Sequence, residues 1–250
     1  MEFSTEILAL LFLVSIFAGW VDTIAGGGGL IVIPALMLAG LSPTGALATN
    51  KLQGSAGTLT SSIYFIRKRE VKLHELKLAI LMTLIGSVIG SWLLLQIDAE
   101  KLMTLLPILL ISMGLYFLFS PAINDIDKKA LISFAGFALI MSPLLGFYDG
   151  FFGPGTGSLM TLAFVLFMGY NLSKATANSK VLNFTSNLGA LIYFLFFGQI
   201  NWTIGIIMML GQFIGASIGA KMVVEKGAPL IKPVVVIVCF VMAINILIKT

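Results

Sequence analysis

Four charged residues of this sequence lie within or beside apolar stretches, and they form two matched pairs. Lys51 and Lys180 are each followed by polar residues at helical spacing, whereas Asp22 and Asp149 each precede a glycine-rich segment. An ionised side chain at the centre of a bilayer costs at least about 2.5 kcal/mol, so it is normally paired or faces a water-filled cavity. These residue types suit two kinds of chemistry. A lysine can bind an anion, and a buried carboxyl can carry a proton.

The residues that follow each lysine place polar groups on one face of a predicted helix, as a path for a small anion requires. Two interpretations stay open. Both lysines contact an anionic substrate, or they have a structural role, either in ion pairs of Lys51 with Asp22 and of Lys180 with Asp149 or by snorkelling toward the membrane surface. The polar residues on or near these faces are Asn50, Lys51, Gly54, Ser55, Thr58 and Ser62 in the first helix and Asn178, Lys180, Asn183, Ser186 and Asn187 in the second.

The glycine-rich segments at 26–29 and 153–157 each precede a short apolar run. A helix that begins there leaves unpaired N–H groups and the positive end of its dipole inside the membrane, which is a geometry that binds anions. The alternative is a flexible hairpin tip or a close helix contact. Gly27, Gly28, Gly155 and Thr156 are the candidate binding residues of these segments. Asp22 and Asp149 are candidates for proton coupling, with hairpin capping or pairing with the lysines as alternatives.

The two sets of residues belong to an internal repeat. Tyr64-Phe65 recurs as Tyr193-Phe194, and the same offset of 129 residues carries Lys51 to Lys180. With a slip of two residues, Asp22 and its glycines match Asp149 and its glycines. Residues 1–121 and 130–250 are therefore predicted to be two copies of one transmembrane unit, joined by a linker at 122–129. The same offset also carries Leu59 to Leu188, Gly86 to Gly215 and Gly90 to Gly219.

Composition decides the class of protein that holds these copies. Hydrophobic residues make up 58% of the 250 residues and charged residues 10%, against about 25% charged residues in soluble domains. This favours an all-α polytopic membrane protein and excludes a nucleic-acid-binding protein, a secreted disulfide scaffold and an ordinary cytosolic enzyme. We expect no catalytic residues, metal or cofactor. The predicted elements are 6–21, 30–40, 44–66, 76–96 and 101–120, then 131–148, 156–169, 173–197, 202–222 and 229–248.

Charge placement predicts how the first two elements of each copy are arranged. The run at 30–40 spans only ~17 Å as a helix, too short for a ~30 Å hydrocarbon core. If the first two elements form a hairpin, eleven Lys/Arg lie on the cytoplasmic side and two lie outside. If they form one broken span, eight lie on the cytoplasmic side and five lie outside. The positive-inside rule favours the hairpin, with loop 67–77 and the linker cytoplasmic and both termini outside. Five elements per copy then make the two repeats inverted, as in secondary transporters.

Three segments carry a resemblance to a known family. Asp22 to Gly29 with Pro34, Ala46 to Lys51, and Gly146 to Pro154 resemble the TauE/SafE family of sulfite exporters, especially its YfcA-type branch. The resemblance covers nearly the whole chain. It implies a carrier of the bacterial inner membrane, in a family with members linked to export of sulfite, sulfoacetate and related sulfur-containing anions.

The residues and the resemblance together predict a secondary transporter of a small sulfur-containing anion that works by alternating access with proton coupling. The alternatives are a passive anion channel that uses the same residues, a carrier of another small organic anion, and a non-transporting membrane scaffold. The expected partners are the anion and the lipid bilayer, with no nucleic acid. The glycine faces at Gly86/Gly90 and Gly211/Gly215/Gly219 predict close helix packing, either within the fold or between the two copies of a homodimer.

Overall fold

The computed structural model describes residues 3–98, scattered positions between 101 and 115, and residues 127–226. Every regular element in these residues is a helix, as the sequence predicts. The predicted element at 229–248 lies outside the described residues, as do most of the element at 101–120 and most of the linker at 122–129.

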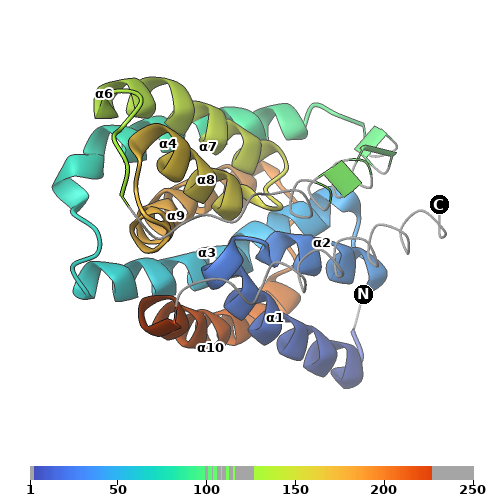
Figure 1. Ribbon diagram of the computed structural model, residues 1–250. Coiled ribbons are helices and arrows are strands. Elements are labelled where there is room, and N and C mark those ends of the chain that lie inside the picture. Colours follow the sequence, from blue (N-terminus) through green and yellow to red (C-terminus); the bar gives the residue numbers. More distant parts are fainter. Residues whose placement is uncertain are drawn as a thin grey trace.

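The helices follow the apolar runs of the sequence (Figure 1). In the first half they are α1 (Thr5–Ala25), α2 (Gly28–Leu38), α3 (Pro43–Arg67) and α4 (Leu73–Leu94). In the second half α6 (Phe134–Gly136), the π-helical turn η1 (Phe137–Met141) and α7 (Ser142–Phe151) are continuous, and α8 (Thr156–Met168), α9 (Leu172–Phe197) and α10 (Trp202–Lys226) follow. The first helix runs past the predicted end at residue 21, and this extension places Asp22 in the last turn of α1.

Within the described residues, five helical segments are long and apolar enough to cross a membrane: Thr5–Ala25, Leu73–Leu94, Phe134–Phe151, Leu172–Phe197 and Trp202–Glu225. Their outer faces carry large exposed apolar side chains, such as Ile85 and Ile89 on α4 and Leu210 and Phe213 on α10. Apolar faces of this kind are stable against lipid and unfavourable in water. The chain is therefore an all-α, multi-pass membrane protein.

The first two helices of each half form a hairpin. Phe3, which precedes α1, and residues 40–42, which follow α2, line the same surface pocket. The start of α1 and the end of α2 therefore lie at the same end of the molecule. In the second half the backbone N–H of Lys128 donates to the carbonyl oxygen of Gly169 at 2.7 Å. The start of the second hairpin and the end of α8 therefore also lie together. Both predicted hairpins are present.

Helices α3 and α9 run antiparallel through the centre of the bundle. The backbone N–H of Asn201, after α9, donates to the hydroxyl of Thr49 near the start of α3 at 3.0 Å. Both helices bury polar side chains; α3 buries Asn50, Gln53 and Thr58. These polar groups explain why α3 is not among the five apolar segments although it is 25 residues long.

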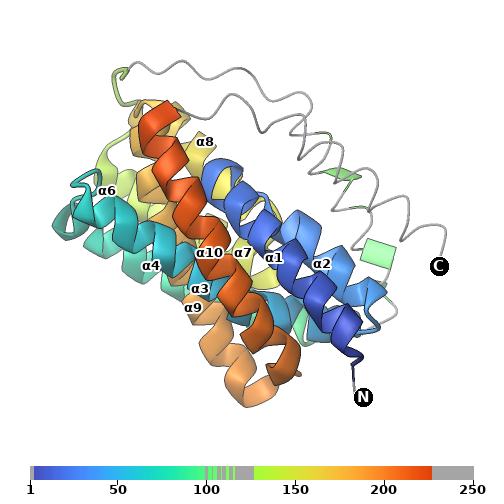
Figure 2. The same cartoon turned by 90° about the horizontal axis from the view of Figure 1, so that it is seen from below.

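Close glycine contacts join the remaining helices. Helix α4 packs on α7, and α10 lies beside α1 (Figure 2). A Cβ atom on Gly86 would lie 2.1 Å from the carbonyl oxygen of Pro143, and one on Gly215 would lie 1.9 Å from that of Ile16. Only residues without a side chain allow backbones to approach so closely. The next glycine of each helix repeats the contact, Gly90 with Phe147 and Gly219 with Trp20.

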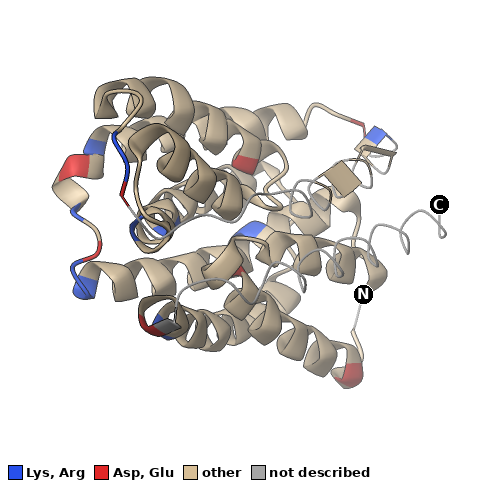
Figure 3. Ribbon diagram, viewed as in Figure 1, with Lys and Arg blue, Asp and Glu red and all other residues tan. Residues whose placement is uncertain are grey.

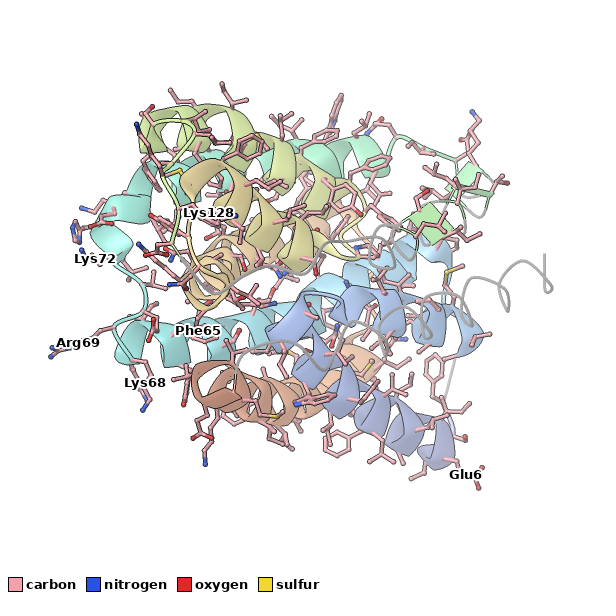
Figure 4. All side chains as sticks on the ribbon, viewed as in Figure 1. Glu6, Phe65, Lys68, Arg69, Lys72 and Lys128 are labelled. Atoms are coloured by element: carbon pink, nitrogen blue, oxygen red, sulfur yellow. The ribbon has the colours of Figure 1, made fainter. Side chains whose placement is uncertain are left out.

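Charged residues gather at one end of the bundle (Figure 3). Lys68, Arg69, Lys72 and Lys128 lie at this end, whereas Glu6 lies at the opposite end (Figure 4). Tyr170, between α8 and α9, lies at this end as well. Burial, and then the carboxylates of Glu75 and Asp127, raise its pKa above the ordinary value. We call the end that carries residues 67–72, 127–129 and 169–174 the basic end.

Candidate functional site

Helix α3 fixes the position of Lys51. The helix starts sharply, because the hydroxyl of Ser42 accepts a hydrogen bond from the backbone N–H of Gly45 at 3.2 Å and Pro43 occupies the first turn. Lys51 follows about two turns later, with 1% of its surface exposed. Helix α9 starts in the same way, with Asn171 as its cap, and it buries Lys180 equally deeply.

Lys51 forms an ion pair with Asp149 of α7. Its Nζ lies 2.9 Å from Asp149 Oδ2, and both side chains are 2% exposed. A lysine and a carboxylate buried this deeply would each be costly alone, so each stabilises the charge of the other. The pair joins the central helix of the first half to the hairpin of the second half.

Lys180 forms the second ion pair, with Asp22 of α1. Its Nζ lies 3.0 Å from Asp22 Oδ2 and also donates to the backbone carbonyl oxygen of Asp22. This pair is less buried on the acid side, since the Asp22 side chain is 16% exposed against 1% for Lys180. The Asp22 carboxylate therefore has more access to solvent or to a ligand than that of Asp149.

The predicted pairing of Lys51 with Asp22 and of Lys180 with Asp149 is wrong, because each lysine pairs with the acid of the other half. The reason is the contact between the two hairpin tips. A Cβ atom on Gly26 would lie 2.2 Å from the backbone nitrogen of Ser158, at the start of α8. This contact holds the end of α1 beside the second half, and Asp22 thereby faces α9.

The hairpin tips depend on glycine for their backbone conformation. Gly26, which ends α1, and Gly155, which precedes α8, have φ angles of 72° and 80°. These values lie in the left-handed region that favours glycine. Gly153 also has a positive φ of 95°, and a Cβ atom there would lie 2.8 Å from Lys51 Nζ. Glycine therefore permits both the turn and the approach of the lysine.

The start of α2 already holds an anionic group of the protein itself. The backbone N–H of Gly28 donates to Asp22 Oδ1 at 3.1 Å. The sequence predicts that this N-terminus binds a substrate anion, and in the structure the Asp22 carboxylate occupies it. A helix N-terminus stabilises a carboxylate through its dipole and its free N–H groups. Asp22 is thus held by both Lys180 and the start of α2.

A small cavity lies where the two ion pairs, the hairpin tips and the two central helices meet. Its volume is about 20 Å³, measured as the space open to the centre of a water molecule, which is enough for about one water. Of the predicted residues, Asp22, Gly28, Asn50, Asp149, Asn183 and Asn187 line it. Gly54 and Thr58 of the α3 face line it as well, together with Gly26, Gly29, Gly153 and Gly157 of the glycine segments.

Six predicted residues do not line the cavity itself. Lys51 and Lys180 instead form ion pairs with Asp149 and Asp22, and these two aspartates line the cavity. Asn178 uses its side-chain N–H to donate to the carbonyl oxygen of Lys174 at 2.7 Å. The Thr156 hydroxyl donates to the Gly153 carbonyl oxygen at 2.7 Å. Gly27 and Gly155 cap α2 and α8.

Comparison with known proteins shows the family of the chain. A family model described as sulfite exporter TauE/SafE matches residues 11–246. The chain belongs to the TauE/SafE family. A protein of Haemophilus influenzae named probable membrane transporter protein is 50% identical over 242 residues, which cover 97% of this chain and 95% of that protein.

Further TauE/SafE relatives carry similar names. The probable membrane transporter protein YfcA of Escherichia coli is 49% identical over 244 residues, covering 98% of this chain and 91% of that protein. The probable membrane transporter protein ORF9 of a Sinorhizobium species is 44% identical over 246 residues, covering 98% and 94%. The resemblance seen in the three sequence segments is confirmed, and the chain is similar to membrane transporters along almost its whole length.

Two residues that line the cavity of this chain were not predicted from the sequence, Gln53 and Gln212. The Gln53 side chain donates to Asn50 Oδ1 at 2.7 Å. Gln212 lies on α10 among the packing glycines, where a Cβ atom on Gly57 would lie 2.4 Å from its Oε1. A buried amide inside a glycine packing face was the signal available for Gln212. Gln53 lies beside the predicted polar face, and helical spacing alone gave no signal for it.

Several buried polar atoms at this site lack a hydrogen-bond partner within the described part of the chain. They include Lys51 Nζ, Asp149 Oδ2 and Gln53 Oε1, although the first two form the ion pair. A lysine ammonium can donate three hydrogen bonds and a carboxylate can accept several. The site therefore retains hydrogen-bonding capacity that a water or a small polar ligand can use.

Proposed function

We propose that this chain is a secondary transporter of a small sulfur-containing anion such as sulfite or an organosulfonate. The observation that carries the proposal is the arrangement of two buried lysines, each held by an aspartate of the other half, around one amide-lined cavity. A membrane protein keeps such charges in its interior at considerable cost, and they usually mark the path of an ion or a substrate. The family description, sulfite exporter, supports the sulfur-containing anion, and export together with a proton then runs down the anion's own outward gradient.

The ion pairs suggest how a proton is coupled to the anion. In the structure Lys180 is occupied by Asp22 at 3.0 Å, so an anion must displace that carboxylate to reach the ammonium group. Protonation of Asp22 removes the competing charge. One proton and one monovalent anion then enter together and leave the net charge of the site unchanged. Both the loaded and the empty site are therefore compatible with the low dielectric of the membrane interior.

Alternating access is supported by the relation between the two halves. The close contacts of Gly86 with Pro143 and of Gly215 with Ile16 recur at repeat-related positions, and the hairpins recur with them. The two inverted repeats, 1–121 and 130–250, then rock around the shared site. The basic end faces the cytoplasm of a bacterial inner membrane, with loop 67–77 inside and both termini outside.

A passive channel for anions is the second candidate, because the same residues also suit conduction. The cavity admits only about one water, and this closed state favours a carrier over a pore that stays open across the membrane. Chemical transformation of the substrate is no part of this proposal, and a homodimer is compatible with it.

Counterflow in proteoliposomes tests the proposal. Liposomes that contain the purified protein are loaded with unlabelled sulfite and diluted into labelled sulfite, with sulfonates and carboxylates as competitors. A carrier accumulates label transiently and saturably, and sulfonates compete better than carboxylates. A conductance without counterflow would support the channel, and exchange of carboxylates alone would reject the sulfur-anion assignment.

A further inference from the structure

The repeated dipeptides Tyr64-Phe65 and Tyr193-Phe194 lie outside the cavity, yet both phenylalanines fall on the polar faces that lead to it. Phe65 follows Lys51 by fourteen positions, and Phe194 follows Lys180 by the same interval. At 3.6 residues per turn, fourteen residues bring a side chain back to within about 40° of its starting direction. Each phenylalanine therefore stands on the same helix face as the lysine, about 21 Å farther along the axis.

Both rings are fully buried and have similar surroundings. Phe65 is 0% exposed and Phe194 is 1% exposed. Each ring meets the edge of the tyrosine that precedes it, with ring centroids 6.0 Å apart in the first half and 6.4 Å apart in the second. The polar face of each central helix thus ends at a buried phenylalanine that lies beside a half-buried tyrosine.

The two pairs lie at opposite ends of the molecule. Phe65 is close to the basic end of α3, near Lys68 (Figure 4). Helix α9 runs in the opposite direction and ends at Phe197, so Phe194 lies in its last turn. The loop after α9 contacts the start of α3 through the hydrogen bond from Asn201 to Thr49. Thr58 and Asn187, which are repeat-related and line the cavity, each lie between the lysine of their helix and its phenylalanine.

We infer that Phe65 and Phe194 are the two gates of the substrate pathway, Phe65 toward the basic end and Phe194 toward the opposite end. A hydrated anion does not cross a constriction lined by apolar rings, since such constrictions lose their water. Movement of one ring at a time opens the cavity to one side only. This inference rests on the proposed transport function and names the residues that separate its two sides.

Side-specific labelling of a cysteine in the cavity tests the gates without any substrate. The native Cys239 is replaced by serine, and Thr58→Cys or Asn187→Cys provides the reporter. A membrane-impermeant anionic methanethiosulfonate is then added to right-side-out or inside-out vesicles. We expect Phe65→Ala to raise the labelling rate at least about tenfold from the basic end alone, and Phe194→Ala to do so from the opposite end alone.

Phe164→Ala is the matched control, because Phe164 is also fully buried but packs against Phe137 and Tyr170 instead of following a polar face. It removes the same ring without opening either side. The inference is overturned if Phe65→Ala and Phe194→Ala change labelling no more than this control, or if both act equally from the two sides. Should an alanine variant not fold, the leucine variants Phe65→Leu and Phe194→Leu give smaller changes with the same sidedness. Side-specific labelling without sulfite exchange would reject the substrate and keep the gates.

Discussion

Lys51 and Asp149 face each other across the two halves of the chain, with Nζ and Oδ2 2.9 Å apart and both side chains 2% exposed. The counterpart pair, Lys180 with Asp22, is longer by only 0.1 Å but leaves its acid 16% exposed. Two pairs of the same composition thus differ in access. The buried pair is suited to holding the halves together, and the more exposed pair is suited to exchanging a carboxylate for a ligand.

Breaking the buried pair on one side should destabilise the protein. Lys51→Met leaves the Asp149 carboxylate buried without a counter-charge, and removing one partner of a buried pair costs about 3–5 kcal/mol. The double variant Lys51→Met/Asp149→Asn removes both charges and should recover most of that stability. Thermal unfolding in detergent measures all three proteins. Equal stability of the single and double variants would contradict the pairing.

Asp22→Asn should uncouple the transporter from protons. The substitution removes the carboxyl that takes up the proton while leaving Lys180 free to bind the anion. Counterflow of sulfite is expected to persist, whereas accumulation driven by a pH gradient should fall at least about tenfold, since the site no longer binds a proton with the anion. Glu225→Gln, an exposed carboxylate near Lys221, is the control and should change neither quantity. Accumulation that survives in Asp22→Asn would assign the coupling proton elsewhere.

The sequence predicted the helical class, the two hairpins and most of the residues that line the cavity, because each rests on local pattern. Apolar runs and glycine segments set the helix ends, and burial of a charge marked both lysines and both aspartates. The pairing could not be predicted, since helical spacing says nothing about which half an aspartate faces. That depends on the contact between Gly26 and the start of α8, which only the assembled fold brings about. Capping of the hairpin by Asp22 was among the alternatives, and the hydrogen bond from Gly28 to its carboxylate is what such a cap requires.

Two glycine substitutions should separate packing from binding. Gly86→Ala places a Cβ atom 2.1 Å from the Pro143 carbonyl oxygen, and such overpacking should cost about 1–3 kcal/mol. Gly54→Ala places its Cβ atom 3.5 Å from Asn187 Oδ1, an ordinary contact, but the methyl group enters the cavity. Gly54→Ala should therefore keep the melting temperature and lower the rate of sulfite exchange. Thermal unfolding and counterflow distinguish the two effects, and a stable, fully active Gly54→Ala would remove this glycine from the site.

The orientation in the membrane should follow the charges. Lys72 and Glu6 are exposed side chains at opposite ends of the molecule (Figure 4). In a Cys239→Ser background, Glu6→Cys should react with an impermeant maleimide on intact spheroplasts, and Lys72→Cys only after the membrane is permeabilised, because basic loops stay in the cytoplasm. The reverse pattern would contradict the proposed orientation and place the basic end outside.

Sulfite binding by the purified protein is the most direct test that the buried lysines recognise the anion. Isothermal titration compares the wild type with Lys180→Gln, Asp22→Asn and the control Lys174→Gln, whose lysine lies over the Tyr170 ring at the basic end. An anion that replaces Asp22 at Lys180 should bind about tenfold more tightly to Asp22→Asn, a gain of about 1.4 kcal/mol. Binding should be lost in Lys180→Gln and unchanged in Lys174→Gln. The same dissociation constant in all four proteins would contradict an anion site at the ion pairs that join the two halves.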